Sequence, residues 1–545
     1  MAAVNSGCVR RPVALIAVVL VLLAGSRVAA QMPLSPATLP PIAPPTVSPV
    51  LPPPVVQLDP PRPSQVLPPP VIEVDPPRTP QVFPDGYLPA PPTQAPSAPG
   101  LYAPLPGAAA PVERIYLPRP IADYAPPGLL RRPPQAGAAY PLYTPLEVIR
   151  PETSPEERSK FVTAGLFPGT YLIPGTKTSM KFYGFVHVDG IFDFNPIGST
   201  DDLVTSSIPI PQGRGQNAVL TPRYTRLGFI TYTPTPVNDW TVQTKLEMDF
   251  FNGNTSGGFG SFPIRLRFAY ADWGYFRFGQ DASVFMDYDV FPNVLDYEGP
   301  PGMVLMRQPV MRITLPLADN VKWAMAVEQP FSDITPSPGG TRIQDLPDFT
   351  TNLRYDTGLG HVQLSGLLRK ITNQPEVGDR QSHLGWGVNL TGDFHPWAAL
   401  LGSNPARKEN PNGLERSRFL GQYAVGYGIN RYIQDVNGLG LDAAAGPGGA
   451  FRLIQGVGWF VGYEHWWSEK WSSTFLYGEA RSFIPASLGL PGDTYKASQY
   501  AAVNLVWVPI PNMMIGGEYL YGARFNLDDQ AGYAHRLQIA FQYNF

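Results

Sequence analysis

The chain has 545 residues and a formal net charge of -3, so it exceeds one ordinary small domain and lacks the basic excess typical of nucleic-acid-binding proteins. Only 15% of its residues are charged, well below the share usual in soluble proteins. The mean hydropathy of -0.10 does not exclude a membrane protein, because only alternate residues of a barrel strand face lipid.

Residues 1–30 have the three-part pattern of a secretory signal peptide. Arg10 and Arg11 precede an apolar run over 12–24, and small residues precede an expected cleavage site before Gln31. An uncleaved membrane anchor is the alternative. The single cysteine, Cys8, lies inside this segment, so the mature protein is expected to contain no disulfide, no cysteine nucleophile and no cysteine metal site. We expect no cofactor and no metal.

Residues 31–155 form a proline-rich, low-complexity segment in which the run 50–62 returns as 66–78. Dense proline removes amide donors and prevents helices and sheets, which favours extended polyproline II. We predict a disordered or polyproline segment in the periplasm. It would act as a spacer or, equally, as a tether to the cell wall or to an envelope protein. Residues 156–180 are interpreted as a lead-in.

From residue 181 to 545 polar and apolar residues alternate with period two, which predicts an all-β, antiparallel transmembrane barrel. The last strand shows the pattern best, and its aromatic end, Tyr543 and Phe545, is similar to the assembly signal of outer-membrane barrels. About sixteen strands are predicted: 181–194, 222–234, 239–250, 263–273, 274–282, 306–316, 320–329, 348–357, 360–371, 382–395, 416–431, 450–466, 470–482, 496–508, 512–523 and 532–545.

The connections between these strands alternate between long and short, as expected for external loops and periplasmic turns. One connection, 396–415, is long where a short turn is expected. Four tryptophans near the turns are interpreted as an interfacial aromatic girdle, with scattered core tryptophans as the alternative: Trp466, Trp467, Trp471 and Trp507.

Several motifs resemble the DcaP-like porins. They are the runs 165–176, 181–186, 223–229, 245–250, 265–270, 278–287, 296–300, 307–309 and 426–432. The resemblance covers roughly residues 165–545 and implies a sixteen-stranded, trimeric porin that passes small, often anionic, organic solutes. Members of that family commonly carry a coiled-coil stretch before the barrel, where this chain has the proline repeat. Contacts between barrels, in place of such a stalk, would then hold the trimer together.

In porins of this type the loop after the fifth strand folds into the lumen, and here that loop is 283–305. The resemblance therefore implies a constriction with four loop acids: Asp287, Asp289, Asp296 and Glu298. The strand alternation places five arginines on the inward face: Arg226, Arg265, Arg267, Arg277 and Arg312. Their neighbours are assigned to the outside: Leu266, Phe268, Phe276, Phe278, Met311 and Ile313. Arginines opposite an acidic loop would create a transverse field, but they could also bind the loop acids and hold the loop to the wall.

Inward-facing His187, Asp189 and Asp193 are a candidate catalytic group. No serine stands beside them at a nucleophile-elbow or other catalytic motif position. We therefore expect that the protein is not an enzyme. The sequence thus predicts an outer-membrane porin for passive diffusion of small hydrophilic solutes, anionic ones in particular. The alternative is a structural envelope protein whose barrel anchors the proline-rich tether.

Overall fold

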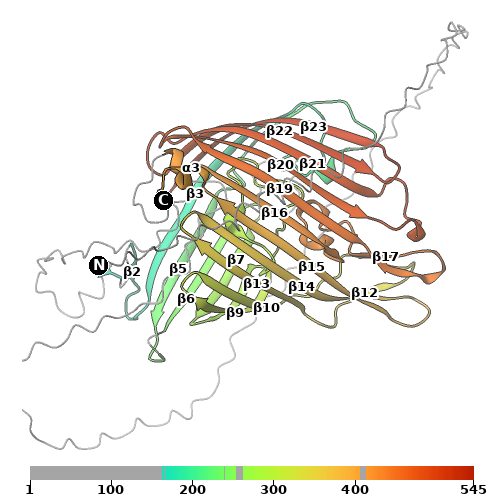
Figure 1. Ribbon diagram of the computed structural model, residues 1–545, viewed down its shortest axis with the longest axis horizontal. Helices are drawn as coiled ribbons and strands as arrows, with labels where there is room; N and C mark the ends of the chain where they lie inside the picture. The colour runs from blue at the N-terminus through green and yellow to red at the C-terminus, as the bar shows by residue number, and fades with distance from the viewer. Residues whose placement is uncertain (1–162, 166, 168, 239, 253–261, 405–412) are drawn as a thin grey trace, which may run out of the picture. The chain divides into compact units, whose positions relative to one another are not determined.

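The computed structural model describes residues 163–545, apart from 166, 168, 239, 253–261 and 405–412 (Figure 1). The predicted signal peptide and the proline-rich segment lie outside these residues and stay predictions. Of the helices that the structure describes, none has both the length and the hydropathy to span a bilayer.

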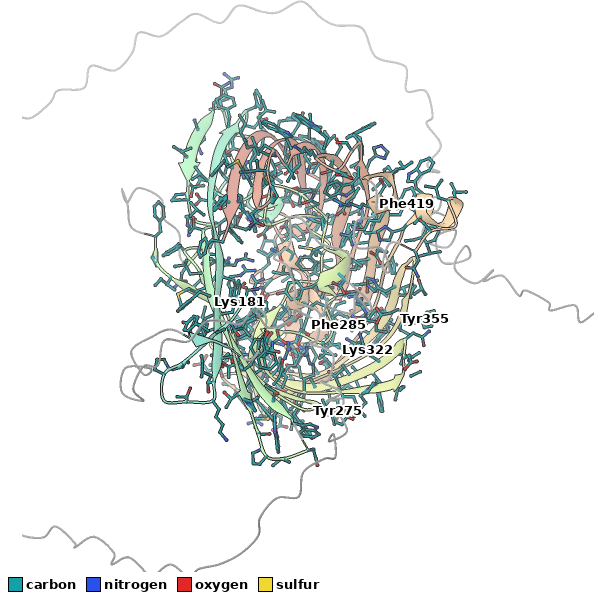
Figure 2. The ribbon with its side chains drawn as sticks, turned by 90° about the vertical axis from the view of Figure 1, so that its left-hand side faces the viewer. Lys181, Tyr275, Phe285, Lys322, Tyr355 and Phe419 are labelled. Carbon is teal, nitrogen blue, oxygen red and sulfur yellow. The ribbon has the colours of Figure 1, made fainter. Side chains whose placement is uncertain are left out.

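The described residues form a closed antiparallel β-barrel in which each strand pairs with its neighbour in the sequence (Figures 1 and 2). The ring closes where the last strand, β23, pairs with β3. The sixteen wall strands are β3 (Ser179–Asp193), β4 with β5 (Asn217–Thr221 and Arg226–Pro234), β6 (Thr241–Asp249), β7 (Arg265–Trp273), β8 (Phe276–Ala282), β9 (Arg307–Ala318), β10 (Val321–Glu328), β13 (Asp348–Thr357), β14 (Gly360–Gln374), β15 (Gln381–Phe394), β16 (Arg418–Tyr427), β19 (Gln455–Trp466), β20 (Trp471–Phe483), β21 (Tyr495–Trp507), β22 (Met513–Asn526) and β23 (Ala531–Asn544). The predicted fold class is therefore confirmed.

Short strands and helices lie outside the wall strands. The strands outside the wall are β1 (Thr163–Ala164), β2 (Tyr171–Leu172), β11 (Ile334–Thr335), β12 (Thr341–Ile343), β17 (Ala443–Ala445) and β18 (Phe451–Leu453). The helices are α3 (Pro396–Leu400), α4 (Gly413–Arg416) and the 3-10 turns η2 (Thr205–Ser207), η3 (Tyr288–Val290), η5 (Asn430–Tyr432), η6 (Gln434–Val436), η7 (Pro447–Gly449) and η8 (Ala486–Leu488). Helices α3 and α4 lie between β15 and β16, in the connection predicted as 396–415, which is long as the sequence indicated.

The strands have one apolar and one polar face. In β23 the outward Ile539 and Phe541 are 65% and 38% exposed, whereas the inward Gln538 and Gln542 are almost fully buried. Figure 2 shows the same division, with Phe285 inside the ring of strands and Tyr355 and Phe419 on its outside. An apolar outer surface around a polar interior is the arrangement that lipid and water impose on a transmembrane barrel.

Three of the four tryptophans assigned to a girdle lie on the outer surface. Trp467, Trp471 and Trp507 are 61%, 39% and 38% exposed, and the last two stack with their rings 5.6 Å apart. The prediction was wrong for Trp466, which is 8% exposed, because its position on β19 is in register with the inward row.

Two strand predictions were also corrected. The strand predicted to reach residue 431 ends at Tyr427, because Gly428 adopts φ 70° and turns the chain into the barrel. Phe268, assigned to the outside, is 7% exposed and faces inward. The reason is a β-bulge: Glu247 pairs with Phe268 and Met248 with Leu266, so Arg267 is an extra residue that reverses the alternation beyond it.

Candidate functional site

Five adjacent strands, β5 to β9, carry all five predicted arginines on one continuous part of the inner wall. The inward position of each arginine follows from the period-two alternation, which puts Arg265 and Arg267 on the same face. The bulge at Arg267 shifts the parity only beyond it, so that Phe268 also faces inward. The inner wall therefore collects the positive side chains that sequence alternation predicted there.

The arginines of β7 bind acids of the neighbouring strand β6. Arg265 donates to Asp249 through Nε and Nη2, at 2.9 and 2.7 Å. Arg267 bridges Glu247 at 2.8 Å and Asp249 at 3.0 Å. Arg226 of β5 lies 3.5 Å from Glu247 on the other side. Paired guanidinium and carboxylate groups of this kind fix the wall geometry as well as its charge.

A second group of ion pairs joins β7, β8 and β9. Arg277 forms two hydrogen bonds to Asp272, at 2.5 and 2.6 Å, and a third to Asp281 at 2.7 Å. Arg312 reaches the same Asp281 at 3.2 Å. The sequence left open whether the arginines bind the loop acids, and the structure shows that these pairs are made with acids of the strands instead.

Burial separates the five arginines into two classes. The side chains of Arg226, Arg267 and Arg277 are 1%, 3% and 4% exposed, so they are part of the packed wall. Arg265 and Arg312 keep 33% and 15% of their side chains exposed. Only the second class can meet a solute directly, and the buried arginines act on it through their field.

The loop 283–306 crosses the interior and carries its acids to the opposite wall. Asp287 lies 2.8 Å from Nε2 of His361 and accepts a 2.6 Å hydrogen bond from Thr391. The His361 imidazole and the Arg354 guanidinium hold the pKa of Asp287 well below its usual range, against the effect of burial. Asp289 lies 2.7 Å from Arg354. Ion pairs therefore hold the first half of this loop to β13 and β14, and not to the arginine-bearing strands β5–β9.

The second half of the same loop meets a different set of partners. Asp296 accepts hydrogen bonds from the Leu203 amide at 3.2 Å and the Tyr500 hydroxyl at 3.1 Å. Glu298 is held by Gln434. The four predicted loop acids therefore do not form one group facing the arginines, since they divide into two pairs at separate parts of the wall.

Sequence reasoning gave no role to Arg307 at the end of this loop. Its Nη1 lies 3.3 Å from the Tyr288 hydroxyl, and the charges of Arg267 and Arg265 act on it. Among the described residues no carboxylate lies within 4.0 Å of the Arg307 guanidinium. Its parity on β9 is that of the exposed Pro309 and Met311, so the strand alternation gave no signal for it.

A second loop that fills the interior was also missed. After Gly428 the chain turns inward, and Ile429, Tyr432, Ile433 and Val436 are fully buried. Ile433 bridges to Val304, so this segment packs against the loop 283–306. The apolar spacing of these residues within a supposed external loop could have indicated a buried turn.

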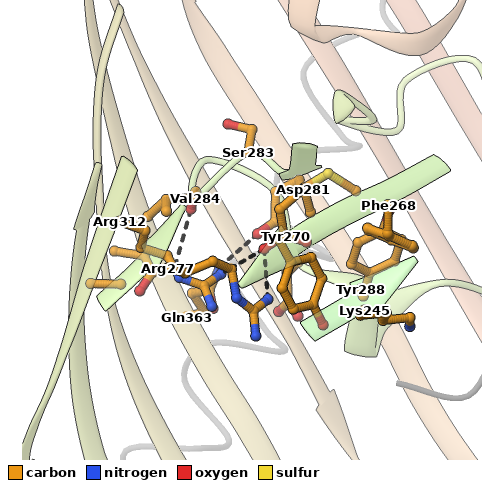
Figure 3. A pocket seen from close by; sticks show the side chains of 15 residues that line it. Lys245, Phe268, Tyr270, Arg277, Asp281, Ser283, Val284, Tyr288, Arg312 and Gln363 are labelled. Carbon is orange, nitrogen blue, oxygen red and sulfur yellow. Dashed lines mark hydrogen bonds and ion pairs between the residues drawn. The ribbon is translucent and has the colours of Figure 1, made fainter. Parts of the chain in front are cut away.

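A cavity of about 60 Å³ lies between the start of the loop 283–306 and the arginine-bearing strands (Figure 3). Lys245, Arg277, Asp281 and Arg312 line it on the strand side, and Asp287 and Tyr288 on the loop side. A space of this size with several polar partners suits a small number of water molecules.

One group of described residues has ligand atoms close enough for a metal: Asp287, Asp289 and His361. Arg354 already lies 3.4 and 2.7 Å from the two carboxylates, so the group is a salt-bridge network. The candidate catalytic residues also lie in networks of hydrogen bonds and ion pairs within the wall. His187 lies between Asp189 and Gln542 at 2.8 and 2.9 Å, and Asp193 binds Arg536 at 2.6 Å.

Together the lipid-compatible barrel, the polar interior and the inserted loop define a porin-like outer-membrane channel fold. Residues 170–396 match the family model described as DcaP outer membrane protein, so the resemblance seen in the sequence motifs is confirmed over that part of the chain. The fold is that of the outer membrane channel DcaP of Acinetobacter baumannii, which is 22% identical, with a TM-score of 0.57 over 68% of this chain and 97% of that chain.

An anion-selective porin from Comamonas acidovorans is 9% identical, with a TM-score of 0.42 over 68% of this chain and 100% of that chain. No curated protein matches the sequence.

Proposed function

We propose that this protein is an outer-membrane channel for passive diffusion of small hydrophilic solutes, with a preference for anions. The observation that carries the preference is the charge of the inner wall over β5–β9. Seven cations face four carboxylates there, an excess of three positive charges. The cations are Arg226, Lys245, Arg265, Arg267, Arg277, Arg307 and Arg312, and the carboxylates are Glu247, Asp249, Asp272 and Asp281.

Arg307 supports this proposal because its charge is not offset by a nearby described carboxylate, while Arg265 is partly exposed. Guanidinium groups stay charged at all relevant pH values and bind carboxylates in a bidentate manner. Low-dielectric walls focus their field, and salt screens it within roughly 8 Å under physiological conditions. The local excess therefore outweighs the net charge of -3 of the whole chain.

The setting of the channel is part of the same proposal. Lipid covers the outer surface, the N-terminal segment lies in the periplasm, and three copies associate, as the resemblance to DcaP-like porins implies. The proposed function needs no chemical step. A tether role for the proline-rich segment stays a prediction, because that segment lies outside the described residues.

Purified full-length protein in a planar bilayer, with a salt gradient, tests the proposal through its zero-current potential. We expect anion preference in the wild type and a weaker preference in Arg307→Gln. The matched control is Arg380→Gln, since Arg380 is a half-exposed arginine beyond the wall strands. Cation preference, or equal potentials for wild type and Arg307→Gln, would overturn the anion assignment. An inserted barrel without ion current would favour the structural envelope role instead.

A further inference from the structure

The long connection between β15 and β16 contains a short helix whose exposed face is apolar. On α3 and its C-terminal cap, Trp397, Leu400 and Leu401 follow one another at spacings of three and four residues from the first, so they share one face. They are 36%, 76% and 58% exposed, whereas Ala398, outside this face, is fully buried. A helix on a surface that meets water turns its apolar face towards the protein. The opposite orientation of α3 indicates that its surroundings are apolar.

Contacts with the barrel hold α3 in this orientation. Its last turn is closed by the Leu401 amide, which donates to the Trp397 carbonyl at 2.9 Å. At its start, Nδ1 of His395 lies 3.2 Å from the carbonyl oxygen of Glu415, and the helix contacts both α4 and β16. Because both ends of α3 are attached, the outward direction of its apolar face is set by the fold.

The apolar face of α3 is continuous with the outer surface of the barrel. Nε1 of Trp397 donates to the Tyr463 hydroxyl of β19 at 2.8 Å, and the Tyr463 ring lies 4.6 Å from the ring of Phe419. Phe419 lies on the outside of the ring of strands (Figure 2). An indole and a phenol whose polar tips meet on an apolar surface are typical of the boundary between lipid and water.

The helix lies at the end of the barrel that carries the short turns. Because each wall strand runs antiparallel to the next, the β15–β16 connection is at the same end as the β19–β20 and β21–β22 turns and the C-terminus (Figure 1). The exposed Trp467, Trp471 and Trp507 lie at these two turns. Short turns are typical of the periplasmic end of bacterial barrels. Trp397 therefore extends the aromatic girdle of that end.

From this arrangement we propose that α3 is an interfacial anchor, whose face of Trp397, Leu400 and Leu401 inserts into the phospholipid leaflet on the periplasmic side of the membrane. Helices of this kind lie in the plane of the interface, with their apolar side chains about 5–10 Å into the boundary of headgroups and acyl chains. A second copy of the protein fits this face less well, because three side chains offer far less than the roughly 800 Å² that each partner buries in a stable interface. The inference does not depend on the proposed anion preference.

Spin labelling of the full-length protein in vesicles of phosphatidylethanolamine and phosphatidylglycerol tests the anchor. Leu400→Cys carries the label on α3, Leu364→Cys is the lipid reference on the outer face of β14, and Val377→Cys is the water reference in the β14–β15 connection. All three are exposed apolar residues, so the labels are matched. Each variant also carries Cys8→Ser, which leaves the added cysteine as the only thiol. We expect positions 364 and 400 to collide mainly with oxygen, and position 377 to collide several-fold more often with a water-soluble nickel complex.

Nickel collisions at position 400 as frequent as at position 377 would show that the face lies in water, and would overturn the anchor. A label protected from both reagents, with dipolar broadening that dilution by unlabelled protein removes, would show that a second copy covers the face and would overturn it too. Leu401→Cys repeats the measurement on the same face if Leu400→Cys fails to fold. None of these readouts uses ion current, so failure of the anchor is distinguishable from failure of the proposed function.

Discussion

Arg265 binds Asp249 through two hydrogen bonds of 2.9 and 2.7 Å, yet 33% of its side chain stays exposed. Its neighbour Arg267 shares the same carboxylate but is 3% exposed. These two arginines on the inner face of β7 therefore differ in role. Arg265 is exposed enough to contact a solute, whereas Arg267 stabilises the wall.

Replacing Arg265 with glutamate should move the zero-current potential in a salt gradient towards cation preference. It should also slow small dicarboxylates while neutral sugars are nearly unaffected, because the substitution reverses an exposed charge at the constriction. The shift should shrink as the salt concentration rises. The control is Arg380→Glu, outside the wall strands. An unchanged potential in folded Arg265→Glu would show that this side chain does not face the solute path.

Arg267→Gln should lower the stability of the barrel, because it leaves Glu247 and Asp249 each without one buried partner. Breaking a buried ion pair in this way costs about 3–5 kcal/mol. Arg307→Gln should cost far less, since no described carboxylate loses a partner. Urea unfolding of both variants in detergent, followed by heat-modifiable mobility, measures the difference, and equal losses would contradict it.

Deleting Phe545 should impair insertion of the barrel. The last residue closes the ring, since its amide donates to the Gly184 carbonyl at 3.0 Å and its carbonyl accepts from the Gly184 amide at 3.3 Å. Phe541→Ala is the matched control, because that aromatic also faces outward and pairs with Val188 in the same β23–β3 seam, four residues before Phe545. The yield of heat-modifiable protein in membranes measures insertion, and wild-type yield after the deletion would disprove the prediction.

The barrel should become less stable as the pH rises from about 4.5 to about 8. The folded protein holds a proton on Glu298 up to about pH 8, whereas the unfolded chain releases it near the ordinary pKa of 4.5. Since the folded state binds more protons in this range, the free energy of unfolding falls with rising pH. Melting temperatures across that range measure it, and Glu298→Gln should flatten the dependence. A flat wild-type profile would contradict the prediction.

The sequence by itself determined the barrel, because a wall between lipid and water imposes period two on every strand, and this pattern is local. It also placed the five predicted arginines on the inward face, but not Phe268, because the bulge at Arg267 shifts the parity beyond it without a local sign in the composition. The charge partners were decided only by the tertiary structure. Whether Arg277 binds Asp272 or a loop acid depends on strand register, and whether Asp287 reaches His361 depends on the path of a loop across the interior. The hydrogen bond from the Ser206 amide to Asp435 joins residues 229 positions apart, so no local pattern could reveal it.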